Sequence, residues 1–259
     1  MKYFDKEINF FKEFGYLQIN SLVDKEYIES FEAAFFEIFK TYSGLNTTKN
    51  FDSEDFVTVF KKFRQKNEVK LNGLFRSITK IQSFKNLFSN EKVLKLLGEI
   101  FNIPSSALII SEYQFRIDEP KDSLFTLDWH QDGAYYEQDK DGKSGIVLNV
   151  CIQNCKKEMG SPELVKGSHK DGRFNSKKYH KAVSNTLQHN TNSEHIDKNK
   201  IIILEPHIGD VVIYDMNLIH KSGFNFSNIS RFSAISRAFN PLSSSFVPFY
   251  FSDKKLLEY

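Results

Sequence analysis

The sequence has few cysteines and almost no net charge, and it contains no long apolar run. Two cysteines, Cys151 and Cys155, among 259 residues argue against a disulfide framework and favour a reducing compartment, so we expect a cytoplasmic protein. Lys and Arg total 35 against 33 Asp and Glu, without the basic excess of proteins that bind nucleic acids or membrane surfaces. No run approaches the ~20 apolar residues that span a bilayer, and the amino terminus has no signal-peptide core. Neither nucleic acid nor a membrane is therefore an expected partner.

Apolar residues make up 40% of the chain, including 26 Phe that we interpret as core packing. The length lies near the upper limit for a single hydrophobic core, so we predict one domain over residues 1–259. Its amino-terminal part, 1–105, is expected to be mainly helical. The strand-rich core is expected at 106–240, with a polar surface loop or lid at 170–200, and a carboxy-terminal tail at 241–259.

The amino-terminal part shows helical spacing of apolar residues in three places. Phe10, Phe11 and Phe14 form an apolar stripe that predicts a helix ending at Gly15. Asp24 suits an N-cap, and the spacing of the apolar residues behind it predicts a helix to about residue 40. A further helix is predicted from about Asn90 to Phe101. The segment Tyr16–Asn20 alternates like a strand. Residues 46–70 are polar and poorly patterned, and no element is predicted there.

From residue 107 onward, short apolar runs alternate with turn residues. Several short strands separated by Gly, Asn and Asp are typical of an all-β sandwich or barrel. We therefore expect a mainly β core with flanking helices. The predicted strands include 107–110, 124–129, 146–152, 201–204, 211–214 and 232–239.

The pattern His-x-Asp occurs three times, at residues 130–132, 169–171 and 195–197. Such a pair on a strand directs two metal ligands to the same side. Only His130 follows an apolar run, and Gly133 follows Asp132, which indicates a strand that ends in a turn. The other two pairs lie in polar segments and are interpreted as solvated loop residues. His130 and Asp132 are therefore the candidate ligands.

A third ligand is expected from a distant strand. His220 follows the turn and apolar run that begin at Gly209, whereas His207 lies between Pro206 and Gly209, which indicates a turn, and is discounted. Two His and one carboxylate on one face of iron(II) leave positions free for oxygen and a co-substrate. His130, Asp132 and His220 are thus predicted to hold one catalytic iron.

Two arginines follow His220 on one predicted strand, where Arg231, Ser233 and Arg237 share a face. An arginine that points into a barrel is costly unless an anion meets it. A guanidinium matches a carboxylate with two parallel hydrogen bonds, and Ser233 supplies a third. Spacing alone leaves two interpretations of Arg231 open, a clamp for a carboxylate co-substrate and a structural ion pair with one of the acidic residues.

Three stretches resemble the phytanoyl-CoA dioxygenase family of Fe(II)/2-oxoglutarate oxygenases. Trp129–Gly133 is similar to the first metal motif of that family, and Met159–Lys170 is similar to its Gly-Ser-His segment. The stretch Gly209–Arg231 resembles its second metal and co-substrate motif. In that family an arginine eleven residues after the distal His binds 2-oxoglutarate, which is the position of Arg231.

The resemblance implies a double-stranded β-helix, that is, a cupin-like jelly roll with helices packed outside. It implies iron(II), O2 and 2-oxoglutarate as cofactor and co-substrates, ascorbate as a reductant, and a small-molecule substrate. Gln114 and Asn149 are implied as further contacts to 2-oxoglutarate, and Tyr135 and Tyr136 are placed near the substrate entrance. Because Asp132 is retained, hydroxylation is expected rather than halogenation.

Two rival functions remain at the level of the sequence. A cupin-like metal enzyme that does not use 2-oxoglutarate would keep the three ligands without needing Arg231. A non-catalytic binding protein could keep the fold alone, because fold does not determine function. Binding of iron and of 2-oxoglutarate separates these alternatives.

Overall fold

The structure is a computed structural model, and it describes residues 3–123, 126–136, 138–139, 142–181 and 186–249. It is a mixed α/β arrangement with antiparallel sheets. Within these ranges, none of the helices combines the length and the hydropathy needed to cross a membrane.

Six α-helices precede the main strands. The helix predicted from about Asn90 to Phe101 is confirmed as α6, and Asn90 caps it, because its side chain accepts a hydrogen bond from the Val93 N–H at 3.1 Å. Within the segment 46–70, where no element was predicted, one helix covers residues 54–66 and another begins at residue 68. Four apolar residues there occupy one helical face and are buried, although the charged residues between them hide the pattern. The helices are α1 (Asp5–Phe14), α2 (Lys25–Ser43), α3 (Glu54–Lys66), α4 (Glu68–Ile78), α5 (Gln82–Ser89) and α6 (Glu91–Phe101).

The strands form two antiparallel sheets and a separate hairpin. The larger sheet has the order β1-β8-β3-β10-β2 and consists of β1 (Tyr16–Ile19), β8 (Val211–Asp215), β3 (Gly145–Val150), β10 (Arg231–Phe239) and β2 (Ile109–Asp118). The smaller sheet has the order β7-β4-β9 and consists of β7 (Ile201–Ile203), β4 (Glu163–Val165) and β9 (His220–Lys221). The hairpin pairs β5 (Lys177–Lys181) with β6 (Thr186–Asn190).

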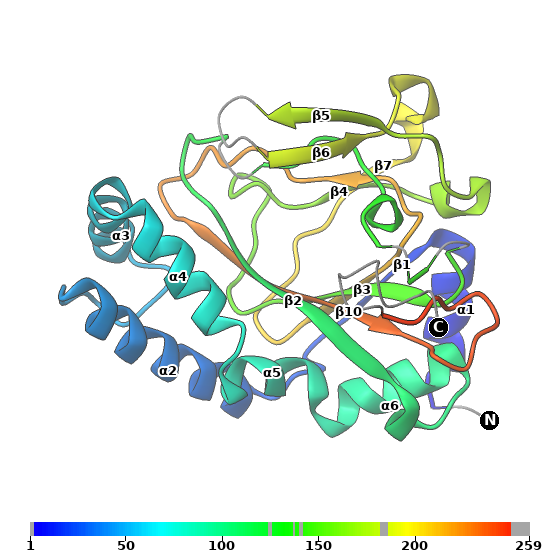
Figure 1. The fold of residues 1–259 in the computed structure, drawn as a ribbon, viewed down its shortest axis with the longest axis horizontal. Coiled ribbons are helices and arrows are strands. Elements are labelled where there is room, and N and C mark those ends of the chain that lie inside the picture. The colour runs from blue at the N-terminus through cyan, green and yellow to red at the C-terminus, as the bar shows by residue number, and fades with distance from the viewer. Residues whose placement is uncertain (1–2, 124–125, 137, 140–141, 182–185, 250–259) are drawn as a thin grey trace, which may run out of the picture.

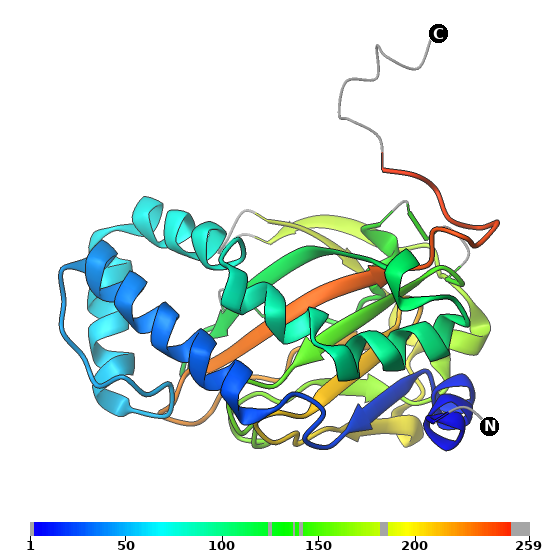
Figure 2. The same cartoon turned by 90° about the horizontal axis from the view of Figure 1, so that it is seen from below.

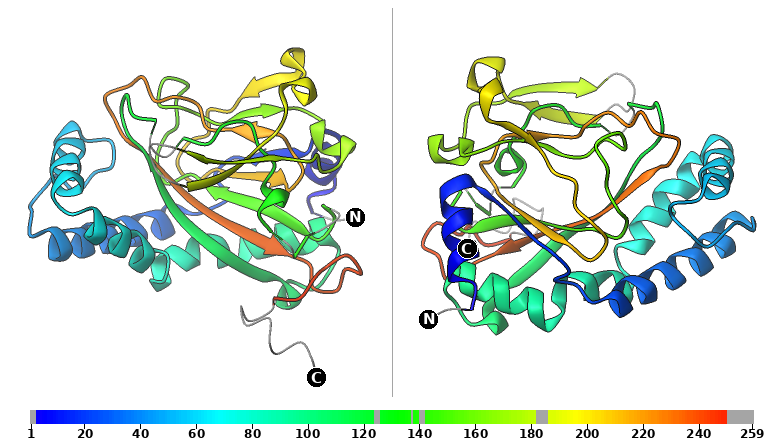
Figure 3. Two further views of the ribbon diagram at one scale, coloured as in Figure 1. Left: turned by 45° about the horizontal axis from the view of Figure 1, so that its top comes forward. Right: turned by 180° about the vertical axis from the view of Figure 1, so that it is seen from behind.

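Helices α2, α5 and α6 lie on one face of the larger sheet and the smaller sheet lies on the other, while α1 lies beside β1 (Figure 1). Seen from below, α2, α5 and α6 cross the outer face of β10 and β2 (Figure 2). The smaller sheet and the hairpin are stacked over the other face (Figure 3). The two faces of β10 and β2 therefore have different surroundings, helices on one side and the smaller sheet with the hairpin on the other.

Phenylalanine rings fill the space between the helices and the larger sheet. Phe35 of α2 and Phe56 of α3 are fully buried and pack against Phe232 of β10, with ring centroids 6.2 and 5.6 Å from it. Phe115 of β2 lies 5.7 Å from the same ring. The excess of phenylalanine thus belongs to the core, as its composition suggested, and it anchors the outer face of the strand that carries Arg231.

Two predicted segments differ from the structure. Of the strand expected at 124–129, residues 124 and 125 lie outside the described residues, and 126–129 form no strand; His130 instead makes an isolated bridge with His220. The polar segment 170–200 was expected to be a loop, yet it contains the β5–β6 hairpin. Backbone hydrogen bonds make such a ladder without apolar side chains, so the polar sequence concealed it.

Candidate active site

The two histidines of the predicted triad are brought together by their own backbones. The His130 N–H donates to the His220 carbonyl at 2.9 Å, and the His220 N–H donates back at 3.0 Å. Asp132 follows at once, as the first residue of a short 3-10 turn. One metal-binding atom from each of the three side chains lies within 4.8 Å of the others, and all three residues are buried. In the described part of the chain, this is the group of ligands that could hold a metal.

Each imidazole is oriented by a backbone carbonyl. His130 Nδ1 lies 2.6 Å from the Asp128 oxygen, and His220 Nδ1 lies 2.9 Å from the Leu218 oxygen. Because a carbonyl only accepts, each Nδ1 must carry the proton and donate it. The two Nε2 atoms are the remaining nitrogens of the rings, and they point toward Asp132 Oδ1, at 3.4 and 3.8 Å, where they can bind a metal.

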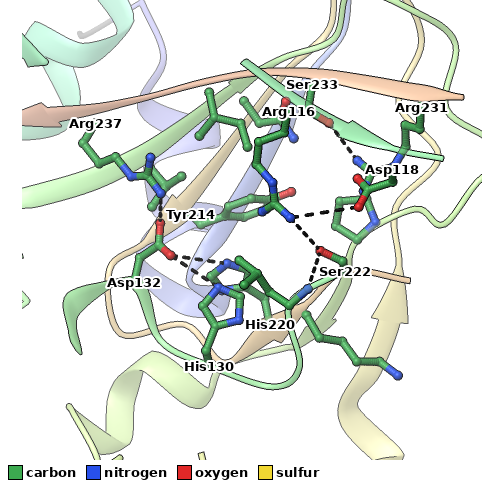
Figure 4. Close-up of a pocket in the computed structure, with 16 residues that line it drawn as sticks. Arg116, Asp118, His130, Asp132, Tyr214, His220, Ser222, Arg231, Ser233 and Arg237 are labelled. Carbon is green, nitrogen blue, oxygen red and sulfur yellow. Dashed lines mark hydrogen bonds and ion pairs between the residues drawn. The ribbon is translucent and has the colours of Figure 1, made fainter. Parts of the chain in front are cut away.

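The two oxygens of Asp132 have separate tasks. Oδ2 accepts a hydrogen bond from Arg237 Nη2 at 2.8 Å, which leaves Oδ1 facing the imidazoles (Figure 4). Burial opposes ionisation, yet the Arg237 guanidinium and the two imidazoles hold the pKa of Asp132 well below its usual range. The sequence placed Arg237 on the same strand face as Arg231 and gave it no partner. In the structure it keeps the Asp132 carboxylate charged and oriented.

His220 is prepared to act as a neutral ligand. Burial lowers its pKa to about 4, and the neighbouring His130 adds to the effect. The ring of Tyr214 from β8 stacks on it, with centroids 5.3 Å apart. Two unprotonated imidazole nitrogens and one carboxylate oxygen are the donor set of non-haem iron(II) sites, so the residues present fit that metal.

The histidines that were discounted lie elsewhere. His169 Nε2 is 3.1 Å from the Lys12 carbonyl, and His195 stacks on Phe174 with ring centroids 3.8 Å apart. The His207 N–H belongs to a turn, where its backbone donates to Asp210. Each has a local structural contact, and none shares the group formed by His130.

Arg231 lies in the pocket beside the triad, and an acidic side chain meets it. Its Nη1 donates to Ser233 Oγ at 2.9 Å, and its Nη2 donates to Asp118 Oδ2 at 2.5 Å. The arginine and Asp118 are both buried. The ion pair that the sequence left open is therefore present, in a pocket that also contains the metal ligands.

Arg116 and Ser222 complete this end of the pocket, and neither was predicted. Arg116 Nη2 lies 3.5 Å from Ser222 Oγ and 4.0 Å from Asp118 Oδ1 (Figure 4). Arg116 faces Ser233 across the β2–β10 register, and Ser222 is two residues beyond His220. The period-2 pattern of β2 could have indicated Arg116, but only the pairing of β2 with β10 brings it to Arg231.

The two further residues proposed for the co-substrate occupy different places. Asn149 of β3 is buried and lines the pocket. Gln114 of β2 lies opposite Ile235 in the sheet and is absent from the described lining of the pocket. Its side chain instead lies 3.4 Å from the Tyr136 hydroxyl.

The two tyrosines after the first motif connect different parts of the site. The Tyr135 ring lies 6.1 Å from that of His130, and its hydroxyl accepts a hydrogen bond from the His189 N–H of the hairpin at 2.8 Å. The Tyr136 ring lies 4.8 Å from the guanidinium carbon of Arg237, and burial raises the pKa of Tyr136 to about 12. Tyr135 thus links the metal motif to the hairpin, and Tyr136 covers the arginine that holds Asp132.

Gln131, between two ligands, ties the site to the base of the hairpin. Its amide donates to the carbonyls of Gly172 and Asn217 at 2.8 and 2.6 Å, and its oxygen accepts from the Phe174 N–H at 2.9 Å. The side chain is 2% exposed. All of its hydrogen-bonding capacity therefore goes to the chain segments that frame the triad.

Asp215, where β8 turns toward His220, makes the stability of the protein depend on pH. Burial raises the pKa of its carboxyl to about 7, and the charge of Asp139 adds to the effect. The unfolded chain loses this proton near pH 4 and the folded chain near pH 7, so the free energy of unfolding falls as pH rises between them.

Asp215→Asn should therefore stabilise the metal-free protein at pH 8 and not at pH 4. The amide oxygen still accepts the Asn217 N–H, and partial solvent screening limits the gain to about 1 kcal/mol, or ~2–4 °C in Tm. Thermal unfolding at both pH values measures this. An equal shift at pH 4 and pH 8 would show that the carboxyl charge is not the cause.

Comparisons with known proteins agree with this geometry. The family model of phytanoyl-CoA dioxygenase (PhyH) matches residues 11–233. The carbocyclase SnoK from nogalamycin biosynthesis, described as non-haem and α-ketoglutarate dependent, is 14% identical with a TM-score of 0.62, over 91% of this chain and 83% of that one. EvdO2 from Micromonospora carbonacea var. aurantiaca, solved with 2-oxoglutarate, is 13% identical with a TM-score of 0.60, over 96% and 93%. No curated protein matches the sequence significantly.

The structural likenesses, at these identities, show a shared fold. The family match is stronger, because it covers most of the chain and includes all three predicted ligands. The chain therefore belongs to the phytanoyl-CoA dioxygenase family of Fe(II)/2-oxoglutarate-dependent oxygenases, with His130, Asp132 and His220 as its candidate metal triad.

Proposed function

We propose that this protein hydroxylates a small molecule and converts 2-oxoglutarate to succinate and carbon dioxide. The observation that carries the proposal is the convergence of two oriented imidazoles and one oriented carboxylate oxygen beside a pocket lined by arginine. We also propose that the two antiparallel sheets form the double-stranded β-helix of the family, with the helices outside it.

The triad would hold iron(II) through His130 Nε2, His220 Nε2 and Asp132 Oδ1. When bound, the metal and 2-oxoglutarate supply oxygen activation coupled to decarboxylation of the co-substrate. Arg237 keeps Asp132 ionised in the buried site, and Tyr136 shields that ion pair from water. The protein contributes orientation and a dry pocket.

The far carboxylate of 2-oxoglutarate would bind among Arg231, Ser233, Arg116 and Ser222. These side chains come from three elements and gather at one end of the pocket, away from Arg237 (Figure 4). Two guanidiniums and two hydroxyls carry more donors than the roughly four hydrogen bonds that a carboxylate can accept. Asn149 lines the same pocket and is proposed as a further contact.

The substrate would approach past the hairpin. Tyr135 lies near His130 and accepts a hydrogen bond from β6, so this contact would hold the hairpin over the metal motif. We propose that this hairpin acts as a lid that excludes water from the site.

Anaerobic titration with iron(II) and 2-oxoglutarate tests the proposal first. Chelation of the iron by a 2-oxo acid should produce a weak visible charge-transfer band. A screen of candidate small molecules with iron(II), ascorbate, 2-oxoglutarate and O2 should then find compounds that increase succinate release. A protein that binds iron but gives no band with 2-oxoglutarate would support a cupin-like enzyme without this co-substrate.

A further inference from the structure

We propose that Asp118 sets the affinity for 2-oxoglutarate by occupying the guanidinium to which the far carboxylate of the co-substrate binds. The inference rests on the function proposed above. Asp118 carries the same chemical group as that carboxylate, and it already lies on Arg231. The co-substrate must therefore displace this carboxylate or share the arginine with it.

The sheet register makes the contact between Asp118 and Arg231 unavoidable. Asp118, the last residue of β2, lies directly opposite Arg231, the first residue of β10. Directly opposed side chains in an antiparallel pair are within reach of one another. The 2.5 Å contact is shielded from water, since Asp118 is 3% exposed and Arg231 is 6% exposed. Solvent therefore does little to weaken the competition.

The charge balance at this end of the pocket gives Arg116 a role beside Arg231. With Arg231 and Asp118 alone, this end would be neutral and would attract a carboxylate weakly. Arg116, 4.0 Å from Asp118 Oδ1, brings the local charge to +1, which matches one carboxylate. Asp118 Oδ1 is buried without a hydrogen-bond partner, so the aspartate is held through its other oxygen. Removing its charge would leave +2 around the co-substrate carboxylate and strengthen their attraction.

The alternative role for Asp118 is to orient Arg231, as Arg237 and Asp132 orient one another. The two roles predict opposite results. If Asp118 competes, its neutralisation tightens binding of 2-oxoglutarate, and if it orients, its loss weakens binding. Asp118→Asn is the variant of choice because the amide oxygen can keep the bond to Arg231 while the charge is lost.

The experiment measures Kd for 2-oxoglutarate by anaerobic titration of the iron(II) protein. Asp118→Asn should lower Kd roughly tenfold. A parallel titration uses 2-oxopentanoate, which has the same chain length but lacks the far carboxylate, and its Kd should not change. Asp122→Asn is the matched control. Asp122 lies four residues after Asp118 in the chain, and it pairs with Arg64 outside the described lining of this pocket. Its Kd should equal that of the wild type.

A second readout does not need the iron. The metal-free Asp118→Asn protein should have a lower Tm, because two buried arginines lose an anion, and 2-oxoglutarate should raise its Tm more than that of the wild type. Should this variant not fold, Asp118→Ser replaces it in both measurements.

An unchanged or higher Kd for 2-oxoglutarate in Asp118→Asn overturns the inference about Asp118 and leaves the proposed function standing. The absence of a band in wild type and control would overturn the proposed function and this inference together.

Discussion

Asp132→Ala should abolish substrate-dependent succinate release, lowering it at least ~10³-fold, the scale on which loss of an essential catalytic group acts. The change removes one of three metal-binding atoms and leaves Arg237 buried without its carboxylate. Both effects act on iron binding, so the visible band with 2-oxoglutarate should also disappear. His220→Ala should have the same result, because it removes the ligand that the other segment of the His130–His220 backbone bridge contributes.

The chain contains its own control for this result. Asp171 belongs to a second His-x-Asp pair, whose histidine bonds to the Lys12 carbonyl and whose aspartate is exposed. Asp171→Ala should therefore keep wild-type succinate release and iron binding. Comparable turnover in Asp132→Ala and Asp171→Ala would refute the ligand assignment. Circular dichroism and Tm of each variant separate loss of the metal site from loss of the fold.

Arg231→Ala should raise the KM for 2-oxoglutarate about 10- to 100-fold with a smaller effect on kcat. Loss of charge-assisted hydrogen bonds to a carboxylate typically costs about 1.5–3 kcal/mol, which corresponds to this factor. The kcat changes less because Arg231 would hold the far end of the co-substrate, away from the metal ligands. Steady-state kinetics with 2-oxoglutarate as the varied substrate measure both constants.

The Asp118 ion pair complicates Arg231→Ala in a way that can be tested. Removing the arginine takes away the hydrogen-bonded partner of the buried Asp118 carboxylate and leaves it Arg116 at 4.0 Å, which should lower Tm. Arg231→Ala combined with Asp118→Asn should recover part of that Tm and still show the high KM. If KM instead returned to the wild-type value in the double variant, the arginine would matter only as the partner of Asp118, and the clamp would lie elsewhere.

The triad could be predicted because each ligand has a distinct local context. An apolar run before His130, a glycine after Asp132 and a buried strand before His220 separate these residues from the other histidines. The strand predicted before His130 was wrong for residues 126–129, which form no strand. The backbone bridge to His220 positions His130 instead. The prediction survived because an extended backbone at one bridge suffices to place His130 and Asp132 on the same side.

The partners of these ligands could not be predicted from spacing. Arg237 lies 105 residues from Asp132, and Arg116 lies 106 residues from Ser222. No local periodicity links such residues, because the pairing of β2, β3 and β10 depends on which apolar faces pack against the phenylalanine layer. The helix α3 was not predicted for a related reason. Its four buried residues can be recognised as a core-facing side only once the phenylalanine layer that they pack against is known.

The sequence by itself determined the residue types of the site, the short-range pairs such as His130 with Asp132, and the shared face of Arg231 and Ser233. These follow from strand and turn geometry over a few residues, which any fold must respect. Only the tertiary structure decided what each charge meets: Asp132 on Arg237, and Asp118 on Arg231. Those contacts depend on which distant strands become neighbours, and burial then makes their electrostatic consequences large.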